Sequence, residues 1–424
     1  MTRPLYLGLD IGTSGVRAIA IDEDGAVGGQ ASAAMPPPAR DGDSVLQDAE
    51  VWWRAVVAAL AGLRAQLPLD RVRAIAVDGT SGTLLLADAD GAPCGPARMY
   101  NDAGCRVEAA RIKAIAPADS GAQGASSALA KLLRLQAGCE AMHALHQADW
   151  VAGRLLGRFG QSDENNALKL GYDVVRRQWP GWFEALGVRR ELLPQVLPPG
   201  RAFGPIDPAI AGRFGFSPET VIVAGSTDGC AAFIATGAAA VGEGVTSLGS
   251  TLVLKLLSDR PIFAPDQGVY SHRLGERWLV GGASNSGGAA LLAFFDEARM
   301  QDLSAGLRPD RPTGLDYYPL PARGERFPIA DPRLAPRVTP RPADDATFFQ
   351  GLLEGIAAIE ARAYRTLETL GAPRLSSVRT VGKGAANSGW TAIRTRCLGV
   401  PLLAPASQEA AYGAALLARQ GAPR

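Results

Sequence analysis

The sequence predicts an α/β protein built from two related domains. With 424 residues, the chain is longer than one ordinary core allows and suits two domains of about 200 residues each. Short apolar runs alternate with Gly/Ser/Thr loops and with helical patterns along the chain. The N-terminal stretch is also echoed near the middle of the chain, which indicates two halves of common design.

The composition points to small partners rather than polymers. The chain carries 43 basic and 42 acidic residues, for a net charge of +1, so nothing in it indicates a nucleic-acid or membrane surface. Its hydrophobic content of 47% with 20% charged residues is typical of a globular protein. The cysteines form no CxxC pair, which argues against a zinc site or a disulfide framework; they are Cys94, Cys105, Cys139, Cys230 and Cys397.

No targeting or membrane segment is expected. The N-terminus enters its first strand almost at once, without a charged segment followed by an apolar stretch. The longest apolar run, Ala231–Val241, falls well short of the roughly 18 residues of a membrane span. We therefore expect a cytoplasmic protein without a membrane partner, either a monomer or a homodimer.

The stretch Leu5–Asp22 reads as two paired strands around a small polar loop. Gly12 in this loop allows close approach to the backbone, and the hydroxyls of Thr13 and Ser14 can point at phosphate oxygens. Asp10 would then face a metal ion, because a lone carboxylate beside phosphate is repulsive. The alternative is a plain hairpin turn made of the residues that turns prefer.

A second Gly and hydroxyl loop echoes the first. When Gly12 is placed over Gly249 without gaps, GTSGVRAIAID falls on GSTLVLKLLSD. Ser247 is then the counterpart of Asp10. The echo predicts that one half holds a metal and that the other half only cradles phosphate.

Between these hairpins the first half contains a second strand–loop–strand unit. A helix capped by Asp48 precedes a buried strand at Arg73–Val77, which runs into the loop Asp78–Thr83. Further on, Asn101 and Asp102 enter a loop that opens a helix, and one of the two can simply cap that helix.

The remainder of the first half is expected to be helix and loop. A largely helical stretch from about Ser126 to Gly157 places His143 and His146 at i, i+3, on a solvated face rather than around a metal. The polar segment Gly160–Asp173 reads as a loop, and five prolines between 194 and 208 mark an irregular connector. Asp228 then follows a buried strand, at a strand end or a helix start, where an N-cap is the alternative.

The second half predicts one long helix and two late Gly-rich elements. Gly281–Phe295 reads as a turn that starts a helix, and loops with a few short strands follow to about Asp345. Helices are predicted over Ala346–Leu370 and Glu409–Arg419. Between them, a turn places Gly384, Ala385 and Asn387 where a nucleotide could meet a helix N-terminus; glycines that pack a helix are the alternative.

These motifs, taken in order, resemble a known family. The chain has neither a GxxxxGK[ST] P-loop nor a GxGxxG fingerprint, yet its two hairpins and late Gly-rich turn resemble the nucleotide cradle of the actin, heat-shock 70 and sugar kinase superfamily. Within it the chain resembles the FGGY carbohydrate kinases. The similar segments are DIGTSGVRA at Asp10–Ala18, GSTDGCAA at Gly225–Ala232, SLGST at Ser247–Thr251, VGKGAANSGW at Val381–Trp390 and EAAYGAALLA at Glu409–Ala418. Lys383 departs from the pattern, since many relatives carry a middle Gly there.

The resemblance implies two actin-like (ribonuclease H-like) ATPase domains with a nucleotide cleft between them. Residues 1–235, completed by the helix 409–424, would form the sugar and catalytic side, and 236–408 the nucleotide side. Asp228 would be the catalytic base on the sugar hydroxyl, and Asp10 and Asp228 would hold Mg²⁺ through water. The residues implied to bind ATP are Asp10, Gly12, Thr13, Ser14, Gly249, Ser250, Thr251, Gly384, Ala385 and Asn387.

The substrate is read from a narrower resemblance. The segments DGTSGT, YND and SDENNALKLGYD, and the chain length, resemble the short D-ribulose kinases of bacteria and plants. On this basis Ser81, Gly82, Asp102 and Asp228 would bind the ketose, and the predicted reaction converts ATP and D-ribulose to D-ribulose 5-phosphate and ADP. A kinase for D-xylulose or a related polyol, and a sugar or nucleotide sensor without catalysis, remain alternatives.

Overall fold

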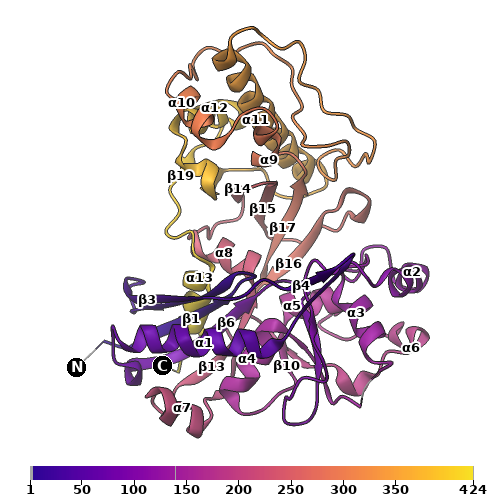
Figure 1. The fold of residues 1–424 in the computed structure, drawn as a ribbon, viewed down its shortest axis with the longest axis vertical. Coiled ribbons are helices and arrows are strands. Elements are labelled where there is room, and N and C mark those ends of the chain that lie inside the picture. Colours follow the sequence, from indigo (N-terminus) through magenta and orange to yellow (C-terminus); the bar gives the residue numbers. More distant parts are fainter. Residues whose placement is uncertain (1–2, 139, 424) are drawn as a thin grey trace. The chain divides into compact units, whose positions relative to one another are not determined.

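The computed structural model describes residues 3–138 and 140–423, and these form two compact units whose elements are labelled in Figure 1. The first unit runs to Ala235 and also takes in His272–Gly275 and the stretch from Glu409 onward. The second unit comprises Thr236–Ser271 and Glu276–Gln408. Of the five cysteines, Cys139 lies outside the described residues, and the other four form no disulfide.

The first unit is built on a six-stranded sheet of order β12-β13-β6-β1-β2-β3. Its strands are β1 (Leu5–Ile11), β2 (Gly15–Ile21), β3 (Val27–Ala34), β6 (Val72–Gly79), β12 (Ala202–Pro205) and β13 (Val221–Thr227). A smaller sheet of order β4-β5-β8-β7-β9 contains β4 (Ala39–Asp41), β5 (Ser44–Gln47), β7 (Leu84–Ala87), β8 (Ala97–Arg98) and β9 (His143–His146). The short strands β10 (Gln161–Asp163) and β11 (Gln195–Leu197) pair in parallel.

Helices cover both faces of the large sheet (Figure 1). The helices that contact its strands are α1 (Ala49–Arg64), α4 (Gln147–Leu156), α5 (Glu164–Leu170), α8 (Asp228–Ala235) and α13 (Ala410–Gly421). The first unit also contains α2 (Arg106–Ile115), α3 (Ala128–Leu135), α6 (Phe183–Leu186) and α7 (Pro208–Phe214), with 3₁₀ turns at Leu69–Arg71 and Arg190–Leu192. The predicted Asp48 cap is confirmed, because its side chain accepts a hydrogen bond from the Glu50 N–H at 3.0 Å.

Strand β1 sends alternate residues to the two faces of the sheet. Leu7 and Leu9 are fully buried in the core that includes α1. Gly8 points the other way, where a Cβ would lie 1.9 Å from the Ala411 carbonyl oxygen of α13. Only glycine therefore lets α13 lie directly on this strand, and Asp10, two residues on, shares the face of Gly8.

The second unit is built on a sheet of order β16-β17-β15-β14-β18-β19. Its strands are β14 (Glu243–Leu248), β15 (Leu252–Ser258), β17 (Arg277–Ser284), β18 (Ser377–Val381), β19 (Leu402–Leu403) and the edge strand β16 (Tyr270–Leu274), which runs into the stretch His272–Gly275 counted with the first unit. Its helices are α9 (Gly288–Leu292), α10 (Glu297–Ser304), α11 (Asp345–Thr369) and α12 (Ser388–Leu398), with 3₁₀ turns at Pro265–Gln267 and Lys383–Ala386. The expected long helix is confirmed as α11, and the expected final helix as α13.

The two sheets repeat one design. In the first unit, β1 pairs antiparallel with β2 and parallel with β6; in the second, β14 pairs antiparallel with β15 and parallel with β18. Placing Gly12 over Gly249 carries the bounds of β2, Gly15–Ile21, onto those of β15, Leu252–Ser258. The echo in the sequence is therefore a structural repeat.

Several local predictions in the first unit are wrong. His143 and His146 do not lie on a solvated helix, since they bound strand β9, and His146 is fully buried with its Nδ1 2.8 Å from Asp149 Oδ2. The stretch from Ser126 to Gly157 is therefore two helices, α3 and α4, separated by a strand. Neither Asn101 nor Asp102 caps α2, which begins after Cys105 without a side-chain cap.

The polar segment Gly160–Asp173 is not a surface loop. It forms β10 and the buried helix α5, which begins where Asp163 accepts hydrogen bonds from the N–H groups of Asn165 at 2.8 Å and Asn166 at 3.1 Å. The connector after it contains β11, β12 and α7. In the second unit, α10 interrupts the predicted loops, and the described residues 305–344 contain isolated bridges instead of the few short strands expected. The burial of α5 was not predicted because its residues are polar, and they can be buried since they hydrogen-bond to one another.

Candidate functional site

Three parallel strands of the first unit end at the same edge of the sheet, and each ends near an aspartate. Asp10 of β1 lies opposite Asp78 of β6, and Asp78 lies opposite Ser226 of β13. The register of β13 shifts between Val223 and Ser226, and a bulge of this kind changes the direction of the residues that follow. Asp228 is the next residue after β13 and the first of α8. In α/β sheets, the carboxyl ends of parallel strands are where ligands bind.

Asp10 is held at the end of β1 by a cation on the neighbouring strand. Its carboxylate is 6% exposed and lies 3.4 Å from Nη1 of Arg17, whose Nε is in turn 3.3 Å from Glu409. Burial raises the pKa of Asp10, and a hydrogen bond with Asp78, followed by the charge of Arg17, offsets part of that shift. The carboxylate is therefore positioned at the base of the first hairpin loop, with a single charged neighbour of opposite sign in the described contacts.

Asp78 is a buried carboxyl group without a donor. It is 0% exposed, and neither of its oxygens accepts a hydrogen bond from any residue that the structure describes. Burial, then the charge of Asp10 and more weakly those of Asp228 and Asp163, raise the pKa of Asp78 well above its usual range. An unpaired buried carboxyl costs stability, so this residue is a candidate for function rather than for structure.

Asp228 is the most accessible of the three aspartates. It is half-buried, and its Oδ1 accepts a hydrogen bond from the N–H of Gly229 at 2.7 Å. Since β13 delivers it and α8 holds it at the first helical turn, its carboxylate is fixed by two rigid elements.

The loop after β6 is anchored by buried side chains from two helices. Gln147 of α4 accepts hydrogen bonds from the N–H of Thr80 at 3.0 Å and from its hydroxyl at 2.7 Å. The fully buried Lys131 of α3 donates to the carbonyl of Gly82 at 2.7 Å, and burial lowers its pKa to about 8. Gly82 has a φ of +88°, which favours glycine. The loop thus presents the Ser81 hydroxyl, whose buried Oγ has no partner among the described residues.

The buried side chain of Asp102 holds its own loop in place through hydrogen bonds. It is 0% exposed; its carboxylate accepts hydrogen bonds from Arg98 at 3.1 Å and from the backbone N–H groups of Val45 at 2.8 Å and Gly104 at 3.2 Å. These contacts occupy both oxygens in a structural role, and the expected contact with a sugar stays a prediction.

The two hairpin loops are braced differently. In the first, the Gly12 N–H donates to the Gly15 carbonyl at 3.0 Å, while Thr13 is half-buried and Ser14 exposed. In the second, the carbonyls of Gly249 and Ser250 accept hydrogen bonds from the first residues of α9, Gly288 at 2.8 Å and Ala289 at 3.1 Å. Ser250 is exposed and Thr251 half-buried, so both loops present hydroxyl groups at their turns.

The late Gly-rich turn combines packing and helix capping. A Cβ on Gly384 would lie 2.7 Å from the Trp390 ring and 2.8 Å from Leu248, so this glycine packs the turn against the strand. Asn387 caps α12 by accepting a hydrogen bond from the Trp390 N–H at 2.8 Å. Ala385 lies between them in the 3₁₀ turn, and Lys383 is exposed with Glu297 at 3.1 Å.

The aspartates of the first unit fit a divalent cation held partly through water. Hard cations such as Mg²⁺ prefer carboxylate oxygens and keep several waters, and the two oxygens of Asp78 beside Asp10 are buried acceptors without a donor. Within the described residues, no group of three or more His, Cys, Asp or Glu side chains is arranged to hold a metal directly. The fit is therefore to a hydrated cation.

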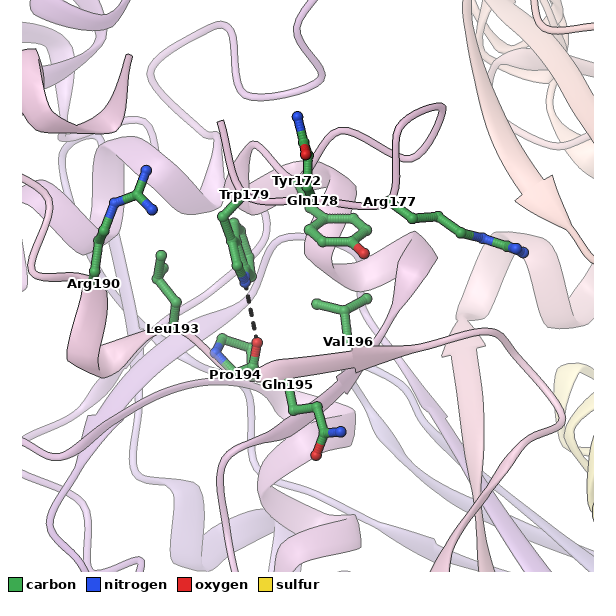
Figure 2. Close-up of a pocket in the computed structure, with 9 residues that line it drawn as sticks. All are labelled: Tyr172, Arg177, Gln178, Trp179, Arg190, Leu193, Pro194, Gln195 and Val196. Carbon is green, nitrogen blue, oxygen red and sulfur yellow. Dashed lines mark hydrogen bonds between the residues drawn. The ribbon is translucent and has the colours of Figure 1, made fainter. Parts of the chain in front are cut away.

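A separate hollow lies beside β11 and the 3₁₀ turn Arg190–Leu192 (Figure 2). It has a volume of about 610 Å³, and the Trp179 indole N–H donates to the Pro194 carbonyl at 3.2 Å on its wall. Its lining is Tyr172, Arg177, Gln178, Trp179, Arg190, Leu193, Pro194, Gln195 and Val196. None of the residues predicted as a site lines this hollow.

Sequence reasoning missed several side chains at this edge of the sheet. Asp78 stood in the DGTSGT motif but was assigned no role, although its position at the end of a buried strand resembles that of Asp228. Gln147 and Lys131 carried no signal, because a polar residue in a helical pattern usually faces solvent. Asn165 stood in the motif Ser162–Asp173, which was expected to be a loop, but it was assigned no role. Asn165 donates to the Ser226 hydroxyl of β13 at 3.0 Å.

Comparison with known proteins places the chain in one family. Residues 5–123 match the N-terminal domain, and residues 244–421 the C-terminal domain, of the FGGY family of carbohydrate kinases. The xylulose kinase of Escherichia coli K12 is 27% identical over 290 residues, which is 65% of this chain and 59% of that protein. The gluconokinase of Bacillus subtilis is 23% identical over 365 residues, 82% of this chain and 67% of that protein. The crystal structure of a xyloylose kinase from Brucella ovis superposes with a TM-score of 0.89 at 24% identity, covering 98% of this chain and 90% of that one.

The repeated sheets and the structural match define a protein with the two-domain, actin-like ATPase fold. The predicted fold class is thereby confirmed. With both domain models matched in order, the chain belongs to the FGGY family of carbohydrate kinases, as its motifs predicted. In the part of the chain that the structure describes, no helix is both long and apolar enough to cross a membrane.

Proposed function

We propose that the protein is an ATP-dependent sugar kinase that uses Mg²⁺ and transfers a phosphoryl group to a hydroxyl of a ketose. The observation that carries this proposal is the edge of the first sheet, where Asp10, Asp78 and the half-buried Asp228 lie at the ends of three adjacent parallel strands. Membership of the FGGY family supports it independently. Mg-ATP supplies the phosphoryl group and neutralises phosphate charge when it is bound.

Asp228 is the proposed catalytic base. A carboxylate at this position can accept a hydrogen bond from the attacking hydroxyl, orient its oxygen and take its proton late in a loose transition state. The helix start at Asp228 keeps this carboxylate fixed, as a general base requires. Asp10 and Asp228 are the proposed metal carboxylates, acting through water.

The nucleotide is proposed to contact the two hairpins and the late Gly-rich turn. Gly12, Thr13 and Ser14 on the first unit, and Gly249, Ser250 and Thr251 on the second, offer backbone N–H groups and hydroxyls to phosphate oxygens. Gly384, Ala385 and Asn387 are the proposed adenosine contacts. The packing of Gly384 and the cap that Asn387 places on α12 fix the shape of this turn. Because the Asn387 side-chain oxygen is occupied by the cap, the proposed contact with adenosine is made by the surface of the turn.

The first unit is the proposed sugar and catalytic side, and the second the nucleotide side. Around the loop that presents Ser81 and Gly82, several buried polar atoms have no partner among the described residues. These atoms are Ser81 Oγ, Gln147 Nε2, His146 Nε2 and Ser162 Oγ. A ligand rich in hydroxyls, such as a sugar with its waters, suits donors and acceptors of this kind.

D-Ribulose is the proposed substrate. The motifs at Asp78–Thr83, Tyr100–Asp102 and Ser162–Asp173 support it through their resemblance to short D-ribulose kinases. D-Xylulose is the second candidate, because xylulose kinases are prominent among the curated relatives and the solved structures.

The test is an ADP-release assay with Mg-ATP and a panel of D-ribulose, D-xylulose, gluconate, erythritol and glycerol. The proposal expects the highest kcat/KM with D-ribulose, and a higher value with D-xylulose would transfer the assignment to the second candidate. Asp228→Asn should lower kcat by about 10²–10⁴-fold, the usual contribution of a general base. If no sugar raises ADP release, or if Asp228→Asn leaves kcat unchanged, the proposed function is wrong.

A further inference from the structure

The buried carboxyl of Asp78 has no structural partner that explains it. Elsewhere in the first unit, buried aspartates are satisfied: Asp102 by Arg98 and backbone N–H groups, Asp149 by both the backbone N–H and the ring of His146. Asp78 is equally buried, yet no described residue donates a hydrogen bond to it. A buried carboxyl that accepts no hydrogen bond, and whose neighbour across the sheet is another carboxyl, is expected to act on a ligand.

The neighbours of Asp78 point to the ligand's charge. In the parallel register it faces Asp10, and Asp228 and Asp163 also act on it electrostatically. The one cation in contact with the pair in the described contacts is Arg17, at 3.4 Å from Asp10, and its side chain is 57% exposed and shared with Glu409. Two carboxyls with one partly shared monovalent partner leave negative charge that a divalent cation would neutralise.

Since Asp78 is 0% exposed, it lies behind Asp10 rather than at the open side of the site. We propose that Asp78 is a positioning residue for the metal: it acts through Asp10, and the two carboxyls together form an electrostatic seat for a hydrated divalent cation. The proposal rests on the metal site of the proposed function and adds a residue to which neither the family match nor the motif reading gives a role.

This arrangement predicts different effects on stability and on metal affinity. Asn at position 78 keeps the size of the side chain and no N–H or hydroxyl donor is lost, so the metal-free fold should keep its stability. With metal, the same change removes one of the two carboxyls beneath the cation. A residue with a purely structural role would lose stability on substitution and leave metal affinity unchanged.

The experiment measures Mn²⁺ binding to the full chain by electron paramagnetic resonance of free Mn²⁺, without sugar or nucleotide, together with thermal unfolding. Asp78→Asn should weaken Mn²⁺ binding at least about tenfold and leave the Tm of metal-free protein within about 2 °C of the wild type, which is less than the shift that 1 kcal/mol produces in a domain of this size. The increase in Tm that Mn²⁺ causes in the wild type should be smaller in this variant.

Asp149→Asn is the matched control, because Asp149 is a buried aspartate of the same unit with satisfied oxygens. It should lower Tm and leave Mn²⁺ affinity unchanged. Unchanged Mn²⁺ affinity in Asp78→Asn would overturn the proposal, as would a Tm lowered to the same extent as in the control. Asp78→Ser provides a second variant if Asp78→Asn does not fold. These readouts need no turnover, so they stand even if no sugar proves to be a substrate.

Discussion

The two hairpins of this chain share their backbone design and differ in their chemistry. The hairpins β1–β2 and β14–β15 have the same antiparallel pairing. The first strand of each hairpin also pairs in parallel with a strand that ends in a glycine-containing loop. In the first unit the facing residues are Asp10 and Asp78; in the second the corresponding residues are Ser247 and Val381. The two copies therefore share the geometry of the hairpin, and the carboxyl pair that we propose as the metal site is present in the first copy, whereas Ser247 and Val381 stand in the second.

Buried charge is also used differently in the two units. In the second unit, Glu360 and Arg394 are almost fully buried and form a two-pronged ion pair at 2.6 and 2.7 Å, with Thr246 and Thr380 as further partners. In the first unit, Asp78 is buried without a donor among the described residues. The charges of Glu360 and Arg394 are satisfied by each other within the core, whereas the carboxyl of Asp78 is left for the cation that we propose.

The largest expected effect comes from making the first hairpin like the second. Asp10→Ser places at position 10 the residue type that the second copy carries at position 247. We expect kcat/KM to fall on the order of 10³-fold, because metal-dependent charge stabilisation contributes several kcal/mol to phosphoryl transfer. Initial rates at varied Mg²⁺ and ATP measure this loss.

Thermal unfolding of Asp10→Ser provides the control. Since burial raises the pKa of Asp10, its removal should leave Tm unchanged or higher in metal-free protein. If the variant keeps wild-type kcat/KM, the difference between the two hairpins has no catalytic meaning.

Breaking the buried pair of the second unit should affect stability instead of chemistry. Glu360→Ala leaves the guanidinium of Arg394 buried without its carboxylate, which costs about 3–5 kcal/mol of unfolding free energy. Urea unfolding measures this loss. The double variant Glu360→Leu/Arg394→Met should recover most of it, because a buried ion pair is replaceable by apolar side chains of similar volume. A double variant as unstable as Glu360→Ala would show that the pair itself stabilises this core.

The repeat and the candidate site differ in how far the sequence could predict them. The hairpins were predictable because β-branched runs, glycines and hydroxyls are local signals, and Asp10 and Asp228 stood beside them. The burial of α5 and of β9 was not, since Asp163, Asn166 and His146 look like surface residues until their partners are known. The register that places Asp78 opposite Asp10 joins residues 68 positions apart, and no local pattern encodes such a pairing.

A pH-dependent stability is expected from the first unit. Burial, and then the charge of Asp149, raise the pKa of Asp163 from 3.8 to about 7. The folded protein therefore binds this proton more tightly than the unfolded chain does, so the contribution of Asp163 to stability is full below about pH 4 and is lost as the pH rises to about 7. Relative to Asp163→Asn, whose amide oxygen can still cap α5, the wild type should lose on the order of 2–4 kcal/mol over that interval.

Urea unfolding of both proteins from pH 4 to pH 8 measures this difference. Subtracting the free energy of unfolding of Asp163→Asn from that of the wild type cancels the titration of the groups that both proteins share. A wild-type-minus-variant difference that is flat with pH would contradict the assignment of a raised pKa to Asp163.

The smallest effect is expected from placing a carboxylate in the second hairpin. Ser247→Asp adds to β14 the charge that Asp10 gives to β1, but Val381 stands where Asp78 would be and no Arg17 counterpart faces it, since its antiparallel partner is Val253. A carboxylate there repels phosphate and has no second carboxyl with which to hold a cation. We expect the KM for ATP to rise about tenfold, or about 1.4 kcal/mol, with the KM for sugar unchanged. Ser247→Asn, which is neutral and of the same size as aspartate, should remain near the wild type. Initial rates against ATP at saturating sugar distinguish the two variants, and equal KM values for ATP would mean that the second hairpin does not lie against phosphate.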